Sequence, residues 1–296
     1  MDRDLDIPDQ PDRQKPGRDV RTRPTLPALI PLEQETIVPE QIAPDRENDQ
    51  RHDGRAVFEL RQRSYRLNNR EAQVLTEVGI FRVIEKGELM KQVYRGDKAS
   101  FDRDLTHLHR QNLVRIIGSK ASPIKYVSLA KPARELVQRY LRSNPDQTIH
   151  AGPVKRREIE HDAALYRMYR HAAQDIANHG GKPRRVHLDF EFRRRINRQL
   201  AKSYHLPKPQ RLRHLLEVAQ RENLKVVNGK VPIPDVRIEY ETAGGGTSYC
   251  DLELVTTNYK AETVAERSAA GFRLYGSSRR GRSANGPDLM GGIISR

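Results

Sequence analysis

Apolar residues recur with helical spacing from residue 68 onwards. Val74, Val78 and Phe81 stand at positions i, i+4 and i+7, which is the spacing that places side chains on one buried face of a helix. Asn68 and Asn69 precede this pattern, and asparagine is a good helix N-cap because its side chain accepts a hydrogen bond from a free backbone N–H. The pattern therefore predicts a helix that begins at these asparagines and packs inward.

Two shorter helical patterns follow. The first lies between the polar break Glu85-Lys86-Gly87 and the closing pair Gly96-Asp97. The second runs from Ser100 to Asn112 and leaves polar side chains on the arc opposite its apolar stripe. The apolar positions of these two predicted helices are Leu89, Met90, Val93, Phe101, Leu105 and Leu108.

The period then changes to two short β-branched segments, residues 114–117 and 126–129, which predict strands. The connection 118–123 contains a glycine and a proline and suits a turn. A bracing helix is expected at about 132–141. Three short helices followed by two strands with a basic loop are typical of a winged helix-turn-helix, which we expect over residues 65–142.

A winged helix presents a recognition helix to the major groove of DNA, and its wing lies next to phosphates. The side chains expected in these roles are Arg103, Thr106, His107 and Arg110 on the helix, with Lys120 and Lys125 at the wing. Two alternatives stay open. The helices instead belong to the core of an unrelated α+β domain, or the module is a winged helix that binds protein or RNA.

A second domain is expected beyond a linker at residues 143–157, which holds Asn-Pro-Asp and Gly-Pro and ends in three basic residues. A long amphipathic helix is predicted from Glu158 to about Asn178, stopped by two glycines. A strand at 185–188 and a very basic helix at 190–202 follow. The arginines expected to contact phosphates from that helix are Arg193, Arg194 and Arg198, with a merely solvated face as the alternative.

After a further helix at 207–223, the apolar pattern alternates as in strands. The predicted strands are residues 225–227, 236–240 and 249–255, with a hairpin turn at Gly244-Gly245-Gly246 between the last two. A closing helix is expected over 259–275, and a loose basic tail over 276–296. The second domain is therefore expected to span residues 158–275.

Charge is unevenly distributed along the 296 residues, whose formal net charge is +15. Residues 1–53 hold 8 Lys/Arg against 13 Asp/Glu, a net of −5, so the rest of the chain carries +20. This acidic, proline-rich leader has too few periodic apolar residues to offset the entropy of ordering, and we expect it to be disordered. The basic remainder favours a polyanionic partner.

Cysteine usage and hydropathy exclude several classes of protein. Cys250 is the single cysteine, which excludes an internal disulfide and a cysteine-based zinc finger. We find no apolar run of about 18 residues and no hydrophobic segment near the amino terminus, so neither a membrane span nor a secretory signal is expected. A cytoplasmic location is the expectation.

Three carboxylates form the main candidate for chemistry. Asp235 follows Pro234 at a strand start, while Asp251 and Glu253 alternate along the partner strand and therefore point to the same face. Three converging carboxylates repel one another unless a divalent cation lies among them, and hard oxygen ligands suit Mg²⁺ or Mn²⁺. Such a metal would activate water for phosphodiester cleavage.

The order helix, strand, Pro-Asp strand, acidic strand and helix resembles the core of the PD-(D/E)xK nucleases. Together with the winged helix it is similar to the replication-relaxation family of bacterial plasmids and integrative elements. The resemblance covers about residues 65–275 and includes His161-Asp162 and the stretch from Leu252 through Tyr259-Lys260 to Phe272 and Tyr275. It implies a DNA-handling protein of a mobile element.

The chain departs from the nuclease pattern at the catalytic lysine. The nuclease pattern places a lysine two residues after the second acid. In this chain that position is occupied by Glu253 if Asp251 is the second acid, and by Val255 if Glu253 is the second acid. Lys260 is the candidate replacement, with Lys225 or Lys230 as others. Three interpretations stay open: a degenerate, non-cleaving nuclease fold, an active metal nuclease with a relocated lysine, and unrelated surface acids.

We therefore expect an α+β protein with a winged helix-turn-helix followed by a nuclease-like α/β/α domain. The expected function is that of a DNA-binding accessory in plasmid replication, relaxation or transfer, with double-stranded DNA and replication or conjugation proteins as partners and no membrane. The alternatives are an active Mg²⁺-dependent endonuclease or nickase, and a winged-helix transcriptional regulator.

Overall fold

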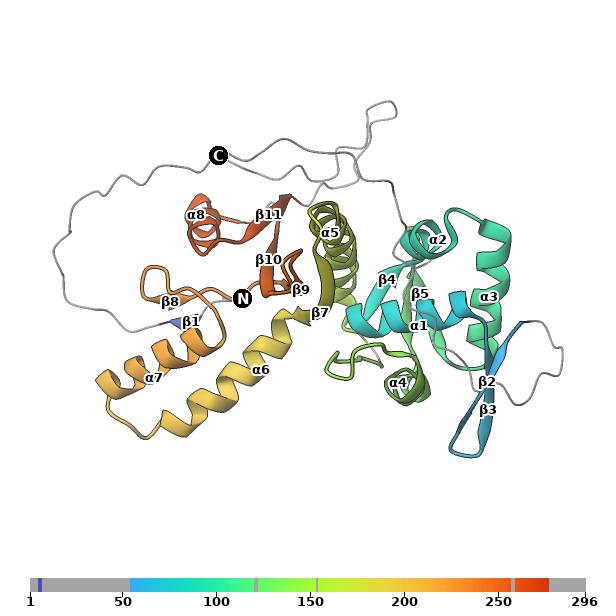
Figure 1. Ribbon diagram of the computed structural model, residues 1–296, viewed down its shortest axis with the longest axis horizontal. Coiled ribbons are helices and arrows are strands. Elements are labelled where there is room, and N and C mark those ends of the chain that lie inside the picture. The colour runs from blue at the N-terminus through green and yellow to red at the C-terminus, as the bar shows by residue number, and fades with distance from the viewer. Residues whose placement is uncertain (1–4, 7–53, 120–121, 153, 257–258, 277–296) are drawn as a thin grey trace, which may run out of the picture.

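The computed structural model describes residues 5–6, 54–119, 122–152, 154–256 and 259–276. Most of the acidic leader, the basic tail beyond residue 276 and the predicted wing residue Lys120 lie outside the described residues. The described part is a mixed α+β fold, as the sequence predicts, with eight α-helices and mostly antiparallel sheets. Figure 1 shows two groups of elements on either side of the long central helix α5.

The first group begins with a β-hairpin and continues with three helices and a three-stranded sheet. Helix α1 starts at a capping box, in which the Asn68 side chain accepts from the Glu71 backbone at 2.8 Å and the Glu71 carboxylate accepts from the Asn68 backbone at 2.9 Å. The elements of the first group are β2 (Ala56–Leu60), β3 (Arg63–Leu67), α1 (Asn69–Phe81), β4 (Val83–Glu85), α2 (Lys86–Tyr94), α3 (Lys98–Arg110), β5 (Val114–Ser119) and β6 (Ser122–Leu129).

The three-stranded sheet is antiparallel in the order β4, β6, β5. Strands β5 and β6 are the two predicted strands, whereas the hydrophobic pattern does not reveal β4, because three residues are too few to show an alternation. The predicted bracing helix is α4 (Lys131–Leu136), extended by one π-helical turn over Val137–Leu141. The apolar faces of α1 and α3 are buried as expected, Val78 and Leu108 completely.

The predicted linker is packed against both groups. Ile149 is completely buried, and the His150 backbone donates to the Gly79 carbonyl at 2.7 Å. The Gln147 side chain forms two hydrogen bonds with the backbone of Val186 in the second group, at 2.8 and 2.9 Å. This segment therefore fastens the two groups together.

The second group is a four-stranded mixed sheet in the order β11, β10, β9, β7. Strands β7, β9 and β10 are antiparallel neighbours, and β11 is parallel to β10 after a crossover through α8. Figure 1 shows α5 on one side of this sheet and α8 on the other. The elements are α5 (Ile159–Asn178), β7 (Lys182–Leu188), α6 (Asp189–Leu200), α7 (Lys208–Arg221), β8 (Lys230–Val231), β9 (Val236–Glu241), β10 (Thr247–Val255), α8 (Ala261–Ala269) and β11 (Arg273–Gly276).

Two predictions in this region are wrong, and one turn is confirmed. The closing helix ends at Ala269, and Arg273–Gly276 form β11, because these residues pair with β10 as a parallel edge strand. Residues 225–227 contribute a single β-bridge rather than a strand. The expected glycine turn closes the β9–β10 hairpin, with Gly245 at a φ of +81°.

Two smaller features complete the fold. Leu5–Asp6, within the predicted leader, forms a two-residue strand, β1, that pairs with β8. Helices α6 and α7 form an antiparallel helical hairpin inserted between β7 and β9, and Figure 1 shows it projecting away from both sheets. No helix within the described residues is long and apolar enough to cross a membrane.

Cys250 lies on the face of β10 that packs toward α5, and burial raises the pKa of its thiol to about 11. Since the thiolate is the reactive form, we expect thiol reagents at about pH 8 to leave the native protein unlabelled. In concentrated urea the same cysteine should be labelled completely. Comparable labelling rates in the two conditions would show that Cys250 is accessible.

The raised thiol pKa also has a consequence for stability. As pH rises through about 9, the unfolded chain loses the thiol proton before the folded chain does. The contribution of this group to stability is therefore complete below pH 9 and declines as pH approaches about 11.

Candidate functional site

The outer face of α3 is a stripe of polar residues. Arg103, Thr106 and Arg110 follow one another at i, i+3 and i+7, and all three are exposed. Other charges near this helix are neutralised, since Lys86 and Lys98 both bind Asp102, at 2.7 and 2.6 Å. Arg103 is exposed but its Nε also lies 3.3 Å from an Asp104 oxygen, whereas Arg110 forms no ion pair with another described residue.

His107 points inward rather than onto this stripe, in contrast to the sequence expectation. Its Nδ1 lies 2.6 Å from a carboxylate oxygen of Glu71, which is completely buried. The Arg55 guanidinium lies 3.1 Å from the Glu71 carboxylate and 3.2 Å from the carboxylate of Asp104. His107 thus belongs to a polar cluster that joins α1 to α3.

Asp104 is the second buried acid of this cluster. The Tyr94 hydroxyl donates to it at 3.2 Å and the Asn68 amide at 3.0 Å. Burial and the negative charge of Asp104 raise the pKa of Tyr94, so its hydroxyl stays a proton donor. Because three elements converge on two buried carboxylates, the orientation of α3 is fixed by hydrogen bonds as well as by apolar packing.

The β2–β3 hairpin lies beside the end of α3 and was missed by sequence reasoning. The Gln111 side chain both donates to and accepts from the backbone of Arg66, each at 3.1 Å, and so extends the edge of β3. The alternating segments around Arg61-Gln62 carry a hairpin signal, but this turn lacks the usual Asn-Gly pair although both residues have a left-handed φ. Exposed Arg66 adds charge next to the end of α3.

The remaining predicted phosphate contacts differ in their surroundings. Lys125 is exposed on β6, opposite Gly118 of β5. On α6, Arg194 and Arg198 are exposed, whereas Arg193 is half-buried and lies 3.5 Å from Asp189.

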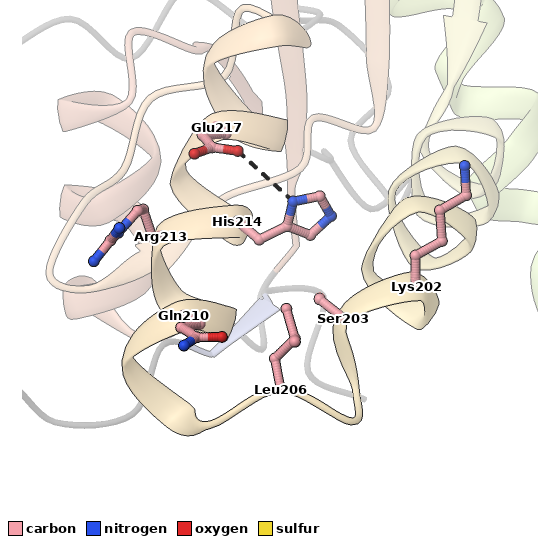
Figure 2. Close-up of a pocket in the computed structure, with 7 residues that line it drawn as sticks. All are labelled: Lys202, Ser203, Leu206, Gln210, Arg213, His214 and Glu217. Carbon is pink, nitrogen blue, oxygen red and sulfur yellow. Dashed lines mark ion pairs between the residues drawn. The ribbon is translucent and has the colours of Figure 1, made fainter.

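A polar pocket separates the end of α6 from α7 (Figure 2). His214 lies on α7, with Nδ1 3.8 Å from Glu217 and Nε2 3.4 Å from the Gln199 carbonyl oxygen. The Ser203 hydroxyl donates to the Leu200 carbonyl at 2.8 Å, so it is held by its own helix and is not poised as a nucleophile. The lining residues are Lys202, Ser203, Leu206, Gln210, Arg213, His214 and Glu217.

The three carboxylates predicted to bind a metal do not form one site. Asp251 is bound by Arg237 from the neighbouring strand, with Nε at 2.6 Å and Nη2 at 2.7 Å from its two oxygens. The same guanidinium donates to the Glu222 carbonyl at 2.5 Å and the Asn223 carbonyl at 3.0 Å. Cross-strand pairing explains the correction, because Arg237 stands directly opposite Asp251 in the sheet.

Asp235 and Glu253 do come together, and both are completely buried. The Leu254 backbone donates to Asp235 at 2.9 Å, and the Asp235 backbone donates to Glu253 at 3.2 Å. Each carboxylate therefore accepts a hydrogen bond from the strand that carries the other.

Three further side chains surround this pair. The Tyr259 hydroxyl donates to Glu253 at 2.6 Å, and the Arg267 Nε lies 3.3 Å from the same oxygen. His161, at the start of α5, places its Nε2 3.7 Å from Asp235. The predicted replacement lysine, Lys260, instead stands exposed at the N-cap of α8.

The cation beside the two acids is thus a buried arginine, Arg267, which sequence reasoning missed. Arg267 lies on α8, and an arginine in a predicted helix is expected on the face exposed to solvent. Among the described residues, no group of three His, Cys, Asp or Glu side chains has the geometry to hold a metal ion. A guanidinium cannot be deprotonated in a protein, so it balances charge without serving as a base.

Comparisons with family models, curated proteins and solved structures found no match to this chain. The arrangement of its residues therefore carries the functional argument.

Arg267→Met tests the role of this buried ion pair. Removing one partner leaves Glu253 without its buried cation, so we expect a loss of about 3–5 kcal/mol in the free energy of unfolding measured by urea denaturation. Lys260→Met, at the N-cap of the same helix and exposed, should cost no more than about 0.5 kcal/mol. Equal effects of the two substitutions would contradict a charge-balancing role for Arg267.

Proposed function

We propose that this protein is a DNA-binding accessory of a bacterial mobile element that acts in plasmid replication, relaxation or transfer. In this proposal residues 65–142 form a winged helix-turn-helix that grips duplex DNA, and residues 158–275 form a nuclease-like domain that binds DNA without cleaving it.

The order of elements supports the winged helix. The chain runs α1, β4, α2, α3, β5, β6, with β6 in the centre of the sheet. This order supports the assignment of β5–β6 as the wing and α3 as the recognition helix. The observation that carries the proposal is the exposed stripe of Arg103, Thr106 and Arg110 on that helix, since arginine and threonine suit base edges in a major groove.

The acidic pair supports a degenerate rather than an active nuclease core. Asp235 immediately precedes β9 and Glu253 lies near the end of β10, which are the positions of the two acids in the PD-(D/E)xK pattern. Val255 then stands where the lysine is wanted. Arg267 supplies a fixed positive charge to Glu253, which removes the need for a divalent cation at that oxygen.

Affinity for duplex DNA at several salt concentrations tests the binding role. We expect tight, salt-dependent binding, because basic residues displace counterions from phosphates. Arg103→Ala and Arg110→Ala should cost about 1–3 kcal/mol on a preferred sequence and less on random DNA. Arg194→Ala and Arg198→Ala should weaken binding to all sequences alike and reduce the salt slope by about 1 each.

Arg134→Ala provides the matched control, since this arginine is exposed on α4 rather than on α3 or α6. Absence of binding at low salt, or binding that ignores salt, would refute the proposal.

Cleavage of supercoiled plasmid in Mg²⁺ or Mn²⁺ tests the enzymatic alternative. Because Arg267 balances Glu253 and Asp251 is bound by Arg237, we expect the plasmid to remain uncut. Nicking that disappears with both Asp235→Ala and Glu253→Ala would instead establish an active nuclease. In that case an Asp251→Ala protein that folds and still nicks the plasmid would show that the loss of nicking is specific to Asp235 and Glu253.

A further inference from the structure

Tyr204 stands at the tip of the α6–α7 hairpin and is 63% exposed, more than any other large hydrophobic residue of the described chain. The next most exposed is Val57, at 56%. Figure 1 shows the hairpin projecting away from the three-stranded and four-stranded sheets, and none of the labelled elements covers its tip.

The tip is an ordered turn. Helix α6 runs into a 3₁₀ turn over Ala201–Ser203, and α7 begins after Pro207. The Leu206 backbone donates to the Ser203 carbonyl at 3.0 Å, and Ser203 itself is buried. Because the backbone is already held, presenting the Tyr204 ring to a ligand costs little ordering entropy.

The surroundings of Tyr204 are basic. Residues 192–216 contain eight Lys/Arg and no Asp or Glu. Arg193 and Arg195 are paired with Asp189 and Glu222 at the base of the hairpin. The exposed cations nearer the tip that form no ion pair with another described residue are Arg194, Arg198, Lys202, Lys208, Arg211 and Arg213.

An exposed aromatic ring among unpaired cations suits single-stranded nucleic acid. The ring stacks on a base, whatever its identity, and the cations contact the flanking phosphates. In a closed duplex the base faces are already stacked on one another, so the ring gains a partner only where a base is unpaired.

We propose that the hairpin tip binds an unpaired base of DNA, with Tyr204 stacked on the base and Lys202 and Lys208 near its phosphates. The inference rests on the proposed DNA-binding function and names its substrate: duplex DNA that adjoins a single-stranded segment. The α3 stripe binds the duplex, and the hairpin binds the strand where it opens.

Fluorescence anisotropy with two labelled DNAs tests the inference. One is a blunt duplex, and the other is the same duplex with a short single-stranded extension. The full-length protein should bind the extended DNA more tightly. Tyr204→Ala should reduce that affinity by about 5- to 150-fold, which corresponds to the ~1–3 kcal/mol of stacking on one base. Its affinity for the blunt duplex should stay unchanged.

Two variants sharpen the test. Tyr204→Phe keeps the ring and should retain the preference, whereas Val57→Ala, at another exposed hydrophobic residue, should affect neither DNA. A 2-aminopurine base in the extension should change fluorescence on binding the parent protein and not on binding Tyr204→Ala.

The outcomes separate the two proposals. Duplex binding without a preference for the extension, or a preference that survives Tyr204→Ala, overturns the hairpin proposal alone. Equal losses on both DNAs overturn it as well, because Tyr204 would then support duplex binding. Failure of the parent protein to bind either DNA removes the proposed function itself.

Discussion

One continuous apolar core, which passes through α5, joins the three-stranded sheet and its helices to the four-stranded sheet. Phe81 of α1 packs against Tyr166 and Tyr169 of α5, with ring centroids 5.2 and 4.8 Å apart, while other residues of α5 cover the four-stranded sheet. Ion pairs surround this contact, among them Arg82 with Asp162 at 3.0 Å and Arg167 with Glu85 at 3.0 Å. Because apolar burial is the dominant stabilising contribution, the two halves cannot separate without exposing shared core surface. The apolar residues of α6 and α7 form a separate cluster, and the end of α7 is joined to the sheet by Arg237, which donates to the Glu222 and Asn223 carbonyls.

Buried charges in this protein are balanced locally. Glu71 and Asp104 share Arg55, Asp251 is bound by Arg237, and Glu253 lies beside Arg267. Each pair joins different segments of the fold, and a buried charge without a partner would cost several kcal/mol, roughly, of desolvation. The cations left without acidic partners are therefore concentrated on the surface, and a basic surface suits a polyanion.

Much of the fold follows from the sequence. The sequence predicted the helices α1, α3 and α5 and the strands β9 and β10 because each carries a periodic apolar pattern. It predicted the turn between the two strands because glycine adopts a positive φ without strain. The sequence pattern did not predict the short elements. Strand β4 has only three residues, and β11 was merged with the preceding helix because four residues cannot display a period of their own. The β2–β3 hairpin escaped because its Arg-Gln turn lacks a glycine signal.

The amino-acid sequence by itself determined the mixed α+β class, the basic charge of the chain after its acidic leader, and the exposure of Arg103, Thr106 and Arg110, since these depend on composition and on periodicity within one helix. Only the tertiary structure decided which charges meet. Asp251 and Glu253 lie on the same face of one strand, yet the first binds Arg237 and the second lies beside Arg267, whose helix is packed onto the sheet by the crossover to β11. The ionic partner of each acid depends on the register between strands and on the packing of a helix against them. The local pattern of apolar and polar residues determines neither of these.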